Sequence, residues 1–287
     1  MVYAVHEGLL RGNKFMLVHI IADYGFGDLA FAEVVQRIKL HLPDAEPILT
    51  PVPAFATLAA GFCIAQLGLH DAPAGTIIYH NVAPRADDEQ ARVGNAGERL
   101  AFARLPTGVR VIGVNAGYAF SFVRDLAVEL RWAAVAAEGS QFRSRDLFPE
   151  AAGAIALGQP EALGDLISPD LIPDVPPNCI AYIDGYGNLK TTIKYDASKA
   201  DHGHPVSLQI GENAREAIAS DGSFAVESGQ LAFAPGSSGW TDVTGEPLRW
   251  MEVFLRGGNA WELFGCPAIG TAITHLPHPV LSQSVFS

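Results

Sequence analysis

The sequence is poor in cysteine and in basic residues, and both shortages exclude classes of protein. Of its 287 residues, three are cysteine and 19 are Lys or Arg, against 31 Asp or Glu. The cysteines lie far apart without metal-binding spacing, so we expect buried free thiols in a reducing compartment instead of a disulfide framework. A formal charge of -12 repels phosphate backbones, and the sequence contains no basic patch that would bind nucleic acid.

Long apolar runs are also missing. No stretch approaches the roughly 18 apolar residues that a membrane span needs. Residues 1–15 lack the apolar core and the cleavage site of a signal peptide. We therefore expect a cytoplasmic protein without membrane contact. The hydrophobic content of 49% excludes a disordered chain and supplies a core for one large domain or two ordinary ones.

The first half of the chain alternates apolar runs of strand length with helical patterns. Strands are predicted at 15–22, 46–52 and 76–82, and helices at 29–42 and 55–67. A hairpin is predicted from strands 100–105 and 109–114 around a turn at 106–108. This order predicts an α/β N-terminal domain with a central mixed or parallel sheet covered by helices.

The second half is dense in turns and predicts a smaller antiparallel, β-barrel-like C-terminal domain. Its short strands are expected at 179–184, 191–195, 205–210, 230–234 and 250–255. Four prolines between 169 and 177 indicate a linker. The predicted division is 1–168 for the N-terminal domain, 169–177 for the linker and 178–287 for the C-terminal domain.

The residues that follow the first predicted strand are candidates for ligand binding. In open α/β sheets, ligands gather at the carboxyl ends of strands. Asp23 follows such a strand, and a carboxylate there can accept two hydrogen bonds from a ribose diol. Asp23 can equally shape the turn, and the sequence does not separate the two roles. For Asp28 we favour a cap on the next helix.

Three further clusters combine polar residues with glycine or serine. Segment 183–189 places an aromatic ring between two glycines beside an acid and an amide, but by itself it is an ordinary β-turn. Segment 235–240 offers backbone amides to an anion or a carbonyl, or forms a simple hairpin turn. In 142–148, Ser144 or Asp146 can cap the next helix, and we favour Asp146. The sequence has no phosphate loop, dinucleotide fingerprint, nucleophile elbow or metal motif.

In this order the motifs resemble the S-adenosylmethionine hydroxide adenosyltransferase family, which also contains the fluorinase and chlorinase enzymes. The matching segments span nearly the whole chain and read Ile20-Ile-Ala-Asp-Tyr-Gly25, Phe142-Arg-Ser-Arg-Asp-Leu-Phe148, Ile183-Asp-Gly-Tyr-Gly-Asn-Leu189, Gly236-Ser-Ser-Gly239 and Gly258-Asn-Ala-Trp-Glu-Leu263. The resemblance implies a homotrimer. S-adenosylmethionine would lie between the N-terminal domain of one subunit and the C-terminal domain of its neighbour, with no metal and no further cofactor.

The resemblance also implies a reaction. A small nucleophile, water or a halide, attacks the ribose C5′ and expels methionine. The sulfonium is already a good leaving group, so the protein mainly positions the partners and strips water from the nucleophile. In the first domain, the resemblance implies that Asp23 binds the ribose hydroxyls and that Tyr24 and Phe142 make further ligand contacts. At the methionine end, it implies Asp184 with Asn188, Ser237 beside the carboxylate, and Ser238 as a further contact. It also implies that Tyr186 lies against the adenosyl group and that Asn259 with Ala260 binds the adenine edge.

The sequence departs from the hydroxide-using members where water is activated. Ala83 stands where those members have an acid, and Arg143 where they have a histidine. Asn115 lies in the segment Val114-Asn-Ala-Gly117, where they have Pro-Asp-Asn-Gly. Arg99 is matched to the family's arginine, and Ser144 is shared with the fluorinase. The expected catalytic residues are therefore Arg99, Arg143 and Ser144.

Three readings follow from these departures. Adenosyl transfer continues with an altered nucleophile site, in which Arg143 attracts an anion. Alternatively an acid of the inserted loop 85–98, Asp87, Asp88 or Glu89, replaces the missing carboxylate. In the third reading the chain binds S-adenosylmethionine or a related nucleoside without turnover. The segment 241–249 is a second insertion, for which the sequence suggests no role.

Overall fold

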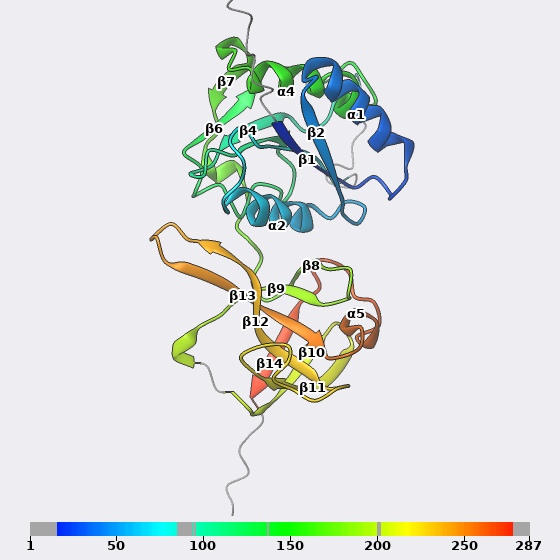
Figure 1. Ribbon diagram of the computed structural model, residues 1–287, viewed down its shortest axis with the longest axis vertical. Coiled ribbons are helices and arrows are strands. Elements are labelled where there is room, and N and C mark those ends of the chain that lie inside the picture. The colour runs from blue at the N-terminus through cyan, green and yellow to red at the C-terminus, as the bar shows by residue number, and fades with distance from the viewer. Residues whose placement is uncertain (1–15, 85–93, 95, 137, 200–201, 278–287) are drawn as a thin grey trace, which may run out of the picture.

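The computed structural model describes residues 16–84, 94, 96–136, 138–199 and 202–277. Within these ranges the chain forms two lobes, each built on a seven-stranded mixed sheet (Figure 1). The two-domain, sheet-rich organisation expected from the sequence is therefore confirmed. Among the described residues, no helix is long and apolar enough to cross a membrane.

The first sheet is half parallel and half antiparallel. Its strands are β1 (Met16–Ala22), β2 (Ala45–Pro51), β3 (Ile77–Asn81), β4 (Leu100–Arg104), β5 (Arg110–Val114), β6 (Glu129–Ala133) and β7 (Leu163–Leu166). They lie in the order β2-β1-β3-β5-β4-β6-β7, with β2, β1, β3 and β5 parallel and the remaining neighbours antiparallel. The apolar run of β1 lies inside the sheet, between β2 and β3, and such a strand is buried on both faces. β6 and β7 are additions that the sequence pattern did not predict.

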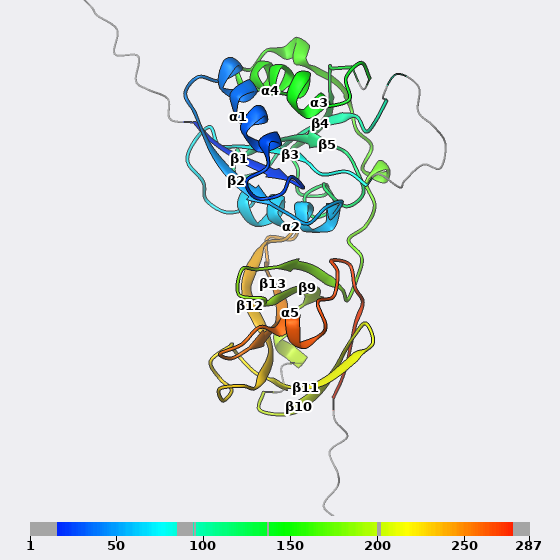
Figure 2. The same cartoon turned by 90° about the vertical axis from the view of Figure 1, so that its right-hand side faces the viewer.

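Helices cover both faces of this sheet. α1 (Leu29–His41), α3 (Arg143–Asp146) and α4 (Phe148–Ala156) lie on the outer face, and α2 (Thr57–Gly68) lies on the face toward the second lobe (Figures 1 and 2). α2 is buried along most of its length, which explains why its sequence is apolar on all sides. α1 begins where Asp28 Oδ1 accepts a hydrogen bond from the amide of Ala30 at 2.8 Å, so the predicted cap is confirmed.

The predicted cap on the helix after residue 142 is wrong. Asp146 lies inside α3, where its carboxylate binds Arg145 and accepts a hydrogen bond from Ser140 at 2.5 Å. α4 begins after Leu147 without a side-chain cap. A proline near the start of α4 lacks one of the amide donors that a cap would satisfy, so this helix depends less on capping.

The second sheet is nearly closed into a barrel. Its strands are β8 (Ile180–Ile183), β9 (Leu189–Lys194), β10 (Pro205–Ile210), β11 (Asn213–Ala219), β12 (Leu231–Thr241), β13 (Pro247–Leu255) and β14 (Ile273–Pro277), in the order β14-β10-β11-β12-β13-β9-β8, with the short helix α5 (Ala260–Leu263) beside β13. A bridge between Cys179 and Ala272 joins the two ends of the sheet. The purely antiparallel prediction is wrong at one place, because β11 and β12 pair parallel through Ile218 and Ala232. A crossover, not a hairpin turn, connects these two strands.

Segment 235–240 is part of a strand and not the hairpin turn that the sequence suggested. β12 continues through it with a register shift between Pro235 and Gly239. Gly236 permits this irregularity, because a Cβ atom there would lie 1.9 Å from the carboxyl carbon of Glu252. The turn itself falls later, at 242–246, where Asp242 accepts hydrogen bonds from the following amides. The insertion 241–249 thus lengthens the β12–β13 hairpin.

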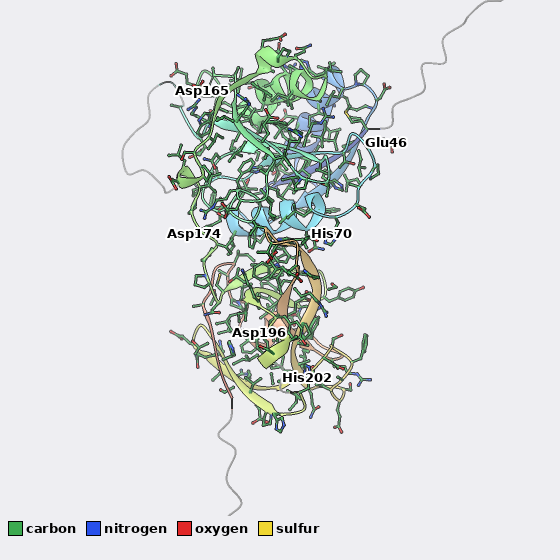
Figure 3. All side chains as sticks on the ribbon, turned by 90° about the vertical axis from the view of Figure 1, so that its left-hand side faces the viewer. Glu46, His70, Asp165, Asp174, Asp196 and His202 are labelled. Atoms are coloured by element: carbon green, nitrogen blue, oxygen red, sulfur yellow. The ribbon has the colours of Figure 1, made fainter. Side chains whose placement is uncertain are left out.

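The lengthened hairpin packs against the first lobe. The ring of Phe62 in α2 lies 6.0 Å from that of Trp240 and 6.1 Å from that of Tyr182. His70, labelled at the junction in Figure 3, brings its Nε2 within 2.6 Å of the Gly239 carbonyl oxygen. The Pro-rich linker is also anchored, since Ile172 is buried. The two lobes therefore share one apolar core cluster.

The three cysteines are free, as expected, but they are not all buried. Cys63 and Cys179 lie in the shared core, whereas Cys266 is exposed. Cys266 has a backbone φ of 58°, in a turn that ends the α5 segment. Its apolar sequence context predicted burial, but the turn carries the side chain to the surface.

Candidate functional site

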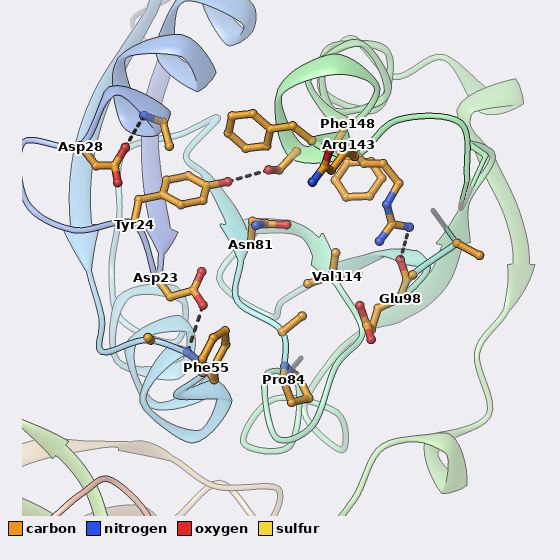
Figure 4. A pocket seen from close by; sticks show the side chains of 18 residues that line it. Asp23, Tyr24, Asp28, Phe55, Asn81, Pro84, Glu98, Val114, Arg143 and Phe148 are labelled. Atoms are coloured by element: carbon orange, nitrogen blue, oxygen red, sulfur yellow. Dashed lines mark hydrogen bonds between the residues drawn. The ribbon is translucent and has the colours of Figure 1, made fainter. Parts of the chain in front are cut away.

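A cavity of about 850 Å³ opens at the carboxyl ends of β1, β3 and β5 (Figure 4). From β1 the chain crosses to β2 on one side and then returns to β3 on the other. The loops after β1 and β3 therefore diverge, and this reversal is where open sheets bind ligands. Asp23 directly follows β1, Asn81 ends β3 and Val114 ends β5, and all three line the cavity.

Asp23 is held at the cavity wall by the loop that follows β2. Its Oδ2 accepts a hydrogen bond from the backbone amide of Phe55 at 3.0 Å. Phe55 has a φ of 62°, a left-handed conformation that is rare for an aromatic residue. Such strain concentrates at ligand sites, because the surrounding structure must hold it in place. The Asp23 carboxylate is thus oriented before any ligand binds.

Tyr24 and Ser144 join the two sides of the cavity. Their hydroxyl oxygens are 2.6 Å apart, although the residues are 120 positions apart in the chain. The Tyr24 ring makes edge contacts with Phe31 and with Phe142 at 5.1 and 5.9 Å. Burial raises the pKa of Tyr24 well above its usual value, and side-chain hydrogen bonds with Ser144 and Asn81 oppose the rise only in part. The Tyr24 hydroxyl is therefore protonated at neutral pH.

α3 owes its position to a second tyrosine. The hydroxyl of Tyr79, in β3, donates a hydrogen bond to the backbone carbonyl of Ser144 at 2.6 Å. Both residues are buried. The sheet therefore fixes the short helix that carries Arg143 and Ser144, so their places at the cavity do not depend on the helix's own weak propensity.

Arg143 and Glu98 form the wall opposite Asp23 (Figure 4). Nη1 of Arg143 donates a hydrogen bond to the backbone carbonyl of Glu98 at 3.1 Å. The guanidinium also lies 5.5 Å from the centre of the Phe148 ring. It packs closely over Gly97, where a Cβ atom would come within 1.8 Å of Nη2. Glycine at this position lets the arginine approach the backbone.

The other sequence-predicted residues of the first lobe behave differently. Arg99 is exposed and stacks 4.0 Å above the Trp132 ring, and it does not line the cavity. Ala83 does line it, so its methyl group faces the ligand space where an acid was sought. Asn115 pairs with Arg99 through its backbone. The acids 87–89 of the inserted loop lie outside the described residues.

In the second lobe, Asp184 holds a tight turn between β8 and β9. Its Oδ1 accepts hydrogen bonds from the amides of Tyr186 and Asn188 at 2.9 and 3.0 Å, and its Oδ2 accepts one from the Asn188 side chain at 3.0 Å. This is the ordinary turn chemistry of an aspartate. The Tyr186 ring at the tip of this turn is 81% exposed.

Asn259 lies against the same turn. Its Oδ1 caps α5 by accepting a hydrogen bond from the Glu262 amide at 3.0 Å. A Cβ atom on Gly187 would lie 1.9 Å from that same oxygen, so only glycine fits at this contact. Ala260 is fully buried and presents no surface within the single chain. Of the two residues predicted to contact the adenine edge, Asn259 is therefore the one that the single chain leaves accessible.

Ser237 and Ser238 line a second hollow of about 410 Å³, which lies beside His70 between the lobes. Ser237 is exposed and Ser238 is buried, with its amide donating to Glu252 at 3.3 Å. Glu252 is in turn bound by Lys190, whose Nζ lies 3.0 Å from both carboxylate oxygens. A buried ion pair thus supports the backbone of this serine segment.

The large cavity therefore unites five of the predicted residues, from the loop after β1 and from α3, namely Asp23, Tyr24, Phe142, Arg143 and Ser144. Its described lining residues all lie between 23 and 148, so a single chain brings none of the second-lobe candidates into it. No cluster of three or more metal-binding side chains occurs in the described part of the chain.

The sequence reasoning missed several lining residues, among them Phe55, Asn81 and Glu98. Asn81 carried a usable signal, since a polar residue that ends an apolar strand points to the ligand edge. Phe55 follows the second parallel strand, but a strained φ leaves no mark in the sequence. Glu98 was included only in a long loop, with nothing to separate it from its neighbours.

Comparison with known proteins supports the fold and adds no activity. No protein-family model matches the chain, and no curated protein matches it either. Among solved structures it is similar to an uncharacterized conserved protein from Thermotoga maritima, with 20% identity, a TM-score of 0.69, and coverage of 90% of this chain and 99% of that one. It is also similar to a conserved hypothetical protein from Thermus thermophilus, with 19% identity, a TM-score of 0.62, and coverage of 91% and 100%. The chain shares its two-lobed fold with these proteins.

Proposed function

We propose that this protein cleaves S-adenosylmethionine, by attack of water, or less readily of a halide, on the ribose C5′, to give adenosine and methionine. The observation that carries the proposal is the placement of Asp23. Asp23 follows β1, an interior parallel strand, and its carboxylate is oriented by the Phe55 amide at a cavity of about 850 Å³. That geometry suits a ribose diol, which donates two hydrogen bonds to one carboxylate.

The charges around the cavity support a cationic ligand. Asp23, Asp28 and Glu98 line it, against the single guanidinium of Arg143 among the described lining residues. A sulfonium is a cation and would be attracted to such a site. The aromatic rings of Tyr24 and Phe142 supply apolar wall for the adenosyl group and exclude water from the reacting atoms.

The second-lobe residues enter the proposal through a homotrimer. Asp184, Asn188 and Ser237 would hold the methionine end in a neighbouring subunit's cavity, and Tyr186 and Asn259 would lie against the adenosyl group. The exposed Tyr186 ring is compatible with such a contact. We place the first lobe in the α/β class and the protein in the cytoplasm, in keeping with its free cysteines.

A second candidate is a protein that binds S-adenosylmethionine or a related nucleoside without turnover. Ala83 favours it, because a methyl group lines the cavity where the resembled family has an acid. The Ser144 hydroxyl favours it as well, since it is engaged by Tyr24 at 2.6 Å. In this reading the ribose site is kept and the water site is lost.

Incubation of the pure protein with S-adenosylmethionine separates these candidates. Chloride and fluoride are each added or omitted, and the products are identified by liquid chromatography with mass spectrometry. The proposal predicts adenosine, or a 5′-halo-adenosine, together with an equal amount of methionine. Saturable binding by calorimetry without any product would instead establish the binder. Neither turnover nor binding would refute both.

A further inference from the structure

Glu98 supplies a carboxylate to the lining of the cavity. It lies two residues before β4, is half-buried and lines the cavity on the wall opposite Asp23 (Figure 4). Arg143 holds its backbone through the hydrogen bond to the Glu98 carbonyl. If Asp23 binds the ribose on one wall, the attacking group approaches from another part of the cavity, where Glu98 is the carboxylate among the described lining residues.

The neutral and cationic groups of the cavity do not accept a proton. The Tyr24 hydroxyl is protonated, because burial raises its pKa. Ser144 shares its hydroxyl with Tyr24. The Arg143 guanidinium is permanently protonated, and the Asn81 amide is not basic. None of these groups can take the proton that a water molecule loses when it attacks carbon.

The other two carboxylates among the described lining residues are assigned to different tasks. Asp28 accepts the Ala30 amide and caps α1. Asp23 accepts the Phe55 amide and, under the proposed function, the two ribose hydroxyls. Glu98 is the third carboxylate of the described lining and lies apart from both. Glu98 also lies in the inserted loop 85–98, from which one reading of the sequence takes an acid to replace the one missing at Ala83. Among the described residues of that loop, it is the acid.

We propose that Glu98 is the general base of the reaction, an inference that rests on the proposed function. The water oxygen forms a bond to C5′ while the bond from C5′ to sulfur breaks. The electron pair of that bond remains on sulfur and gives the neutral thioether of methionine. The proton of the water passes to the Glu98 carboxylate and then to solvent, leaving adenosine with its 5′-hydroxyl. The acid thus comes from a different segment of the chain than in the resembled family.

The test compares Glu98→Gln with Glu46→Gln in the full-length protein. The amide keeps the size of the side chain but cannot take up a proton. Glu46 is an exposed carboxylate at the edge of the same lobe, away from the cavity (Figure 3). We expect Glu98→Gln to lower kcat for adenosine formation about 100-fold, with KM changed less than about threefold, in line with the loss of a general base. Glu46→Gln should match the wild type, and Glu98→Asp should recover part of the rate.

A pH profile adds a readout that a merely structural role would not change. In the wild type, kcat should fall on the acidic side as the base is protonated, and in Glu98→Gln this limb should disappear. Titration with adenosine by calorimetry, and circular dichroism spectra, should be unchanged in the variant. Adenosine formation at the wild-type rate, or a loss confined to KM, would overturn the role of Glu98 and leave the proposed function intact. A wild type that releases no methionine would overturn both.

Discussion

The candidate residues of the two lobes use their polar atoms in different ways. In the first lobe, Asp23 and Arg143 each make a hydrogen bond to backbone and still line an open cavity. In the second lobe, Asp184 and Asn259 direct their oxygens to the amides of their own turn and helix. An aspartate thus lines an open cavity in one lobe and holds a tight turn in the other. A polar motif in a sequence does not by itself distinguish the two.

The largest expected effect tests the first lobe. Asp23→Ala removes both proposed ribose hydrogen bonds, each worth roughly 1.5–3 kcal/mol to a charged group. We expect the affinity for S-adenosylmethionine to fall by 100-fold or more in calorimetric titrations. Ser237→Ala removes a single hydroxyl proposed to lie beside the methionine carboxylate, so it should have a much smaller effect. Unchanged affinity in Asp23→Ala would mean that the cavity is not the ribose site.

The next prediction concerns the pH dependence of stability and compares a buried histidine whose ring has no hydrogen bond within the described residues with a buried carboxylate that is paired with a lysine. Glu252 in the second lobe is bound by Lys190, whereas His80, next to Asn81 of the cavity, is fully buried with neither ring nitrogen hydrogen-bonded by the described residues. Burial lowers the pKa of His80 to about 3, and the nearby Val114 backbone opposes this only weakly.

The sign of the pH dependence follows directly. The unfolded chain binds a proton at His80 below about pH 6.5, and the folded protein does not until about pH 3. The free energy of unfolding should therefore fall by about 3–5 kcal/mol as the pH drops through this window. His80→Leu should lose that part of the dependence, as measured by denaturant unfolding at several pH values. Parallel curves for both proteins would contradict the prediction.

A smaller effect is expected at the turn of the second lobe. Asp184→Ala removes three hydrogen bonds and should lower the free energy of unfolding by about 1–3 kcal/mol. Asp184→Asn retains an acceptor for the two amides and should lose less. If the carboxylate also binds the methionine end in a trimer, Asp184→Asn lowers the affinity for S-adenosylmethionine and leaves that for adenosine unchanged. If Asp184→Asn binds both ligands as tightly as the wild type, the role of Asp184 is confined to the turn.

The smallest effect concerns the cap of α5. Asn259→Ala removes the acceptor for the Glu262 amide and should cost about 1 kcal/mol, whereas Asn259→Ser keeps a capping oxygen. Thermal unfolding monitored by circular dichroism checks the difference. Equal melting temperatures for the two variants would show that packing against Gly187, and not the cap, holds this segment.

Local patterns predicted most elements of the fold. The apolar run before Asp23 is β1, the cap at Asp28 starts α1, and the turn at 106–108 joins β4 to β5. These features depend on residues a few positions apart, so the residue types and their spacing in the sequence are enough to predict them. The failures depended on distant partners. Asp146 bonds to neighbours other than the α4 amides, and β12 continues as a strand because Gly236 makes room for Glu252.

The candidate site divides in the same way. The sequence alone determined that an acid follows the first parallel strand, since strand ends and turn residues are local features. Only the tertiary structure decided that Ser144 meets Tyr24 across 120 residues, that Phe55 orients Asp23, and that Glu98 lies on the opposite wall. Those contacts arise when β2, β1, β3 and β5 pair side by side, because their parallel direction brings their carboxyl ends to one edge. Chain neighbours specify the elements, but the pairing of the sheet specifies which side chains share a cavity.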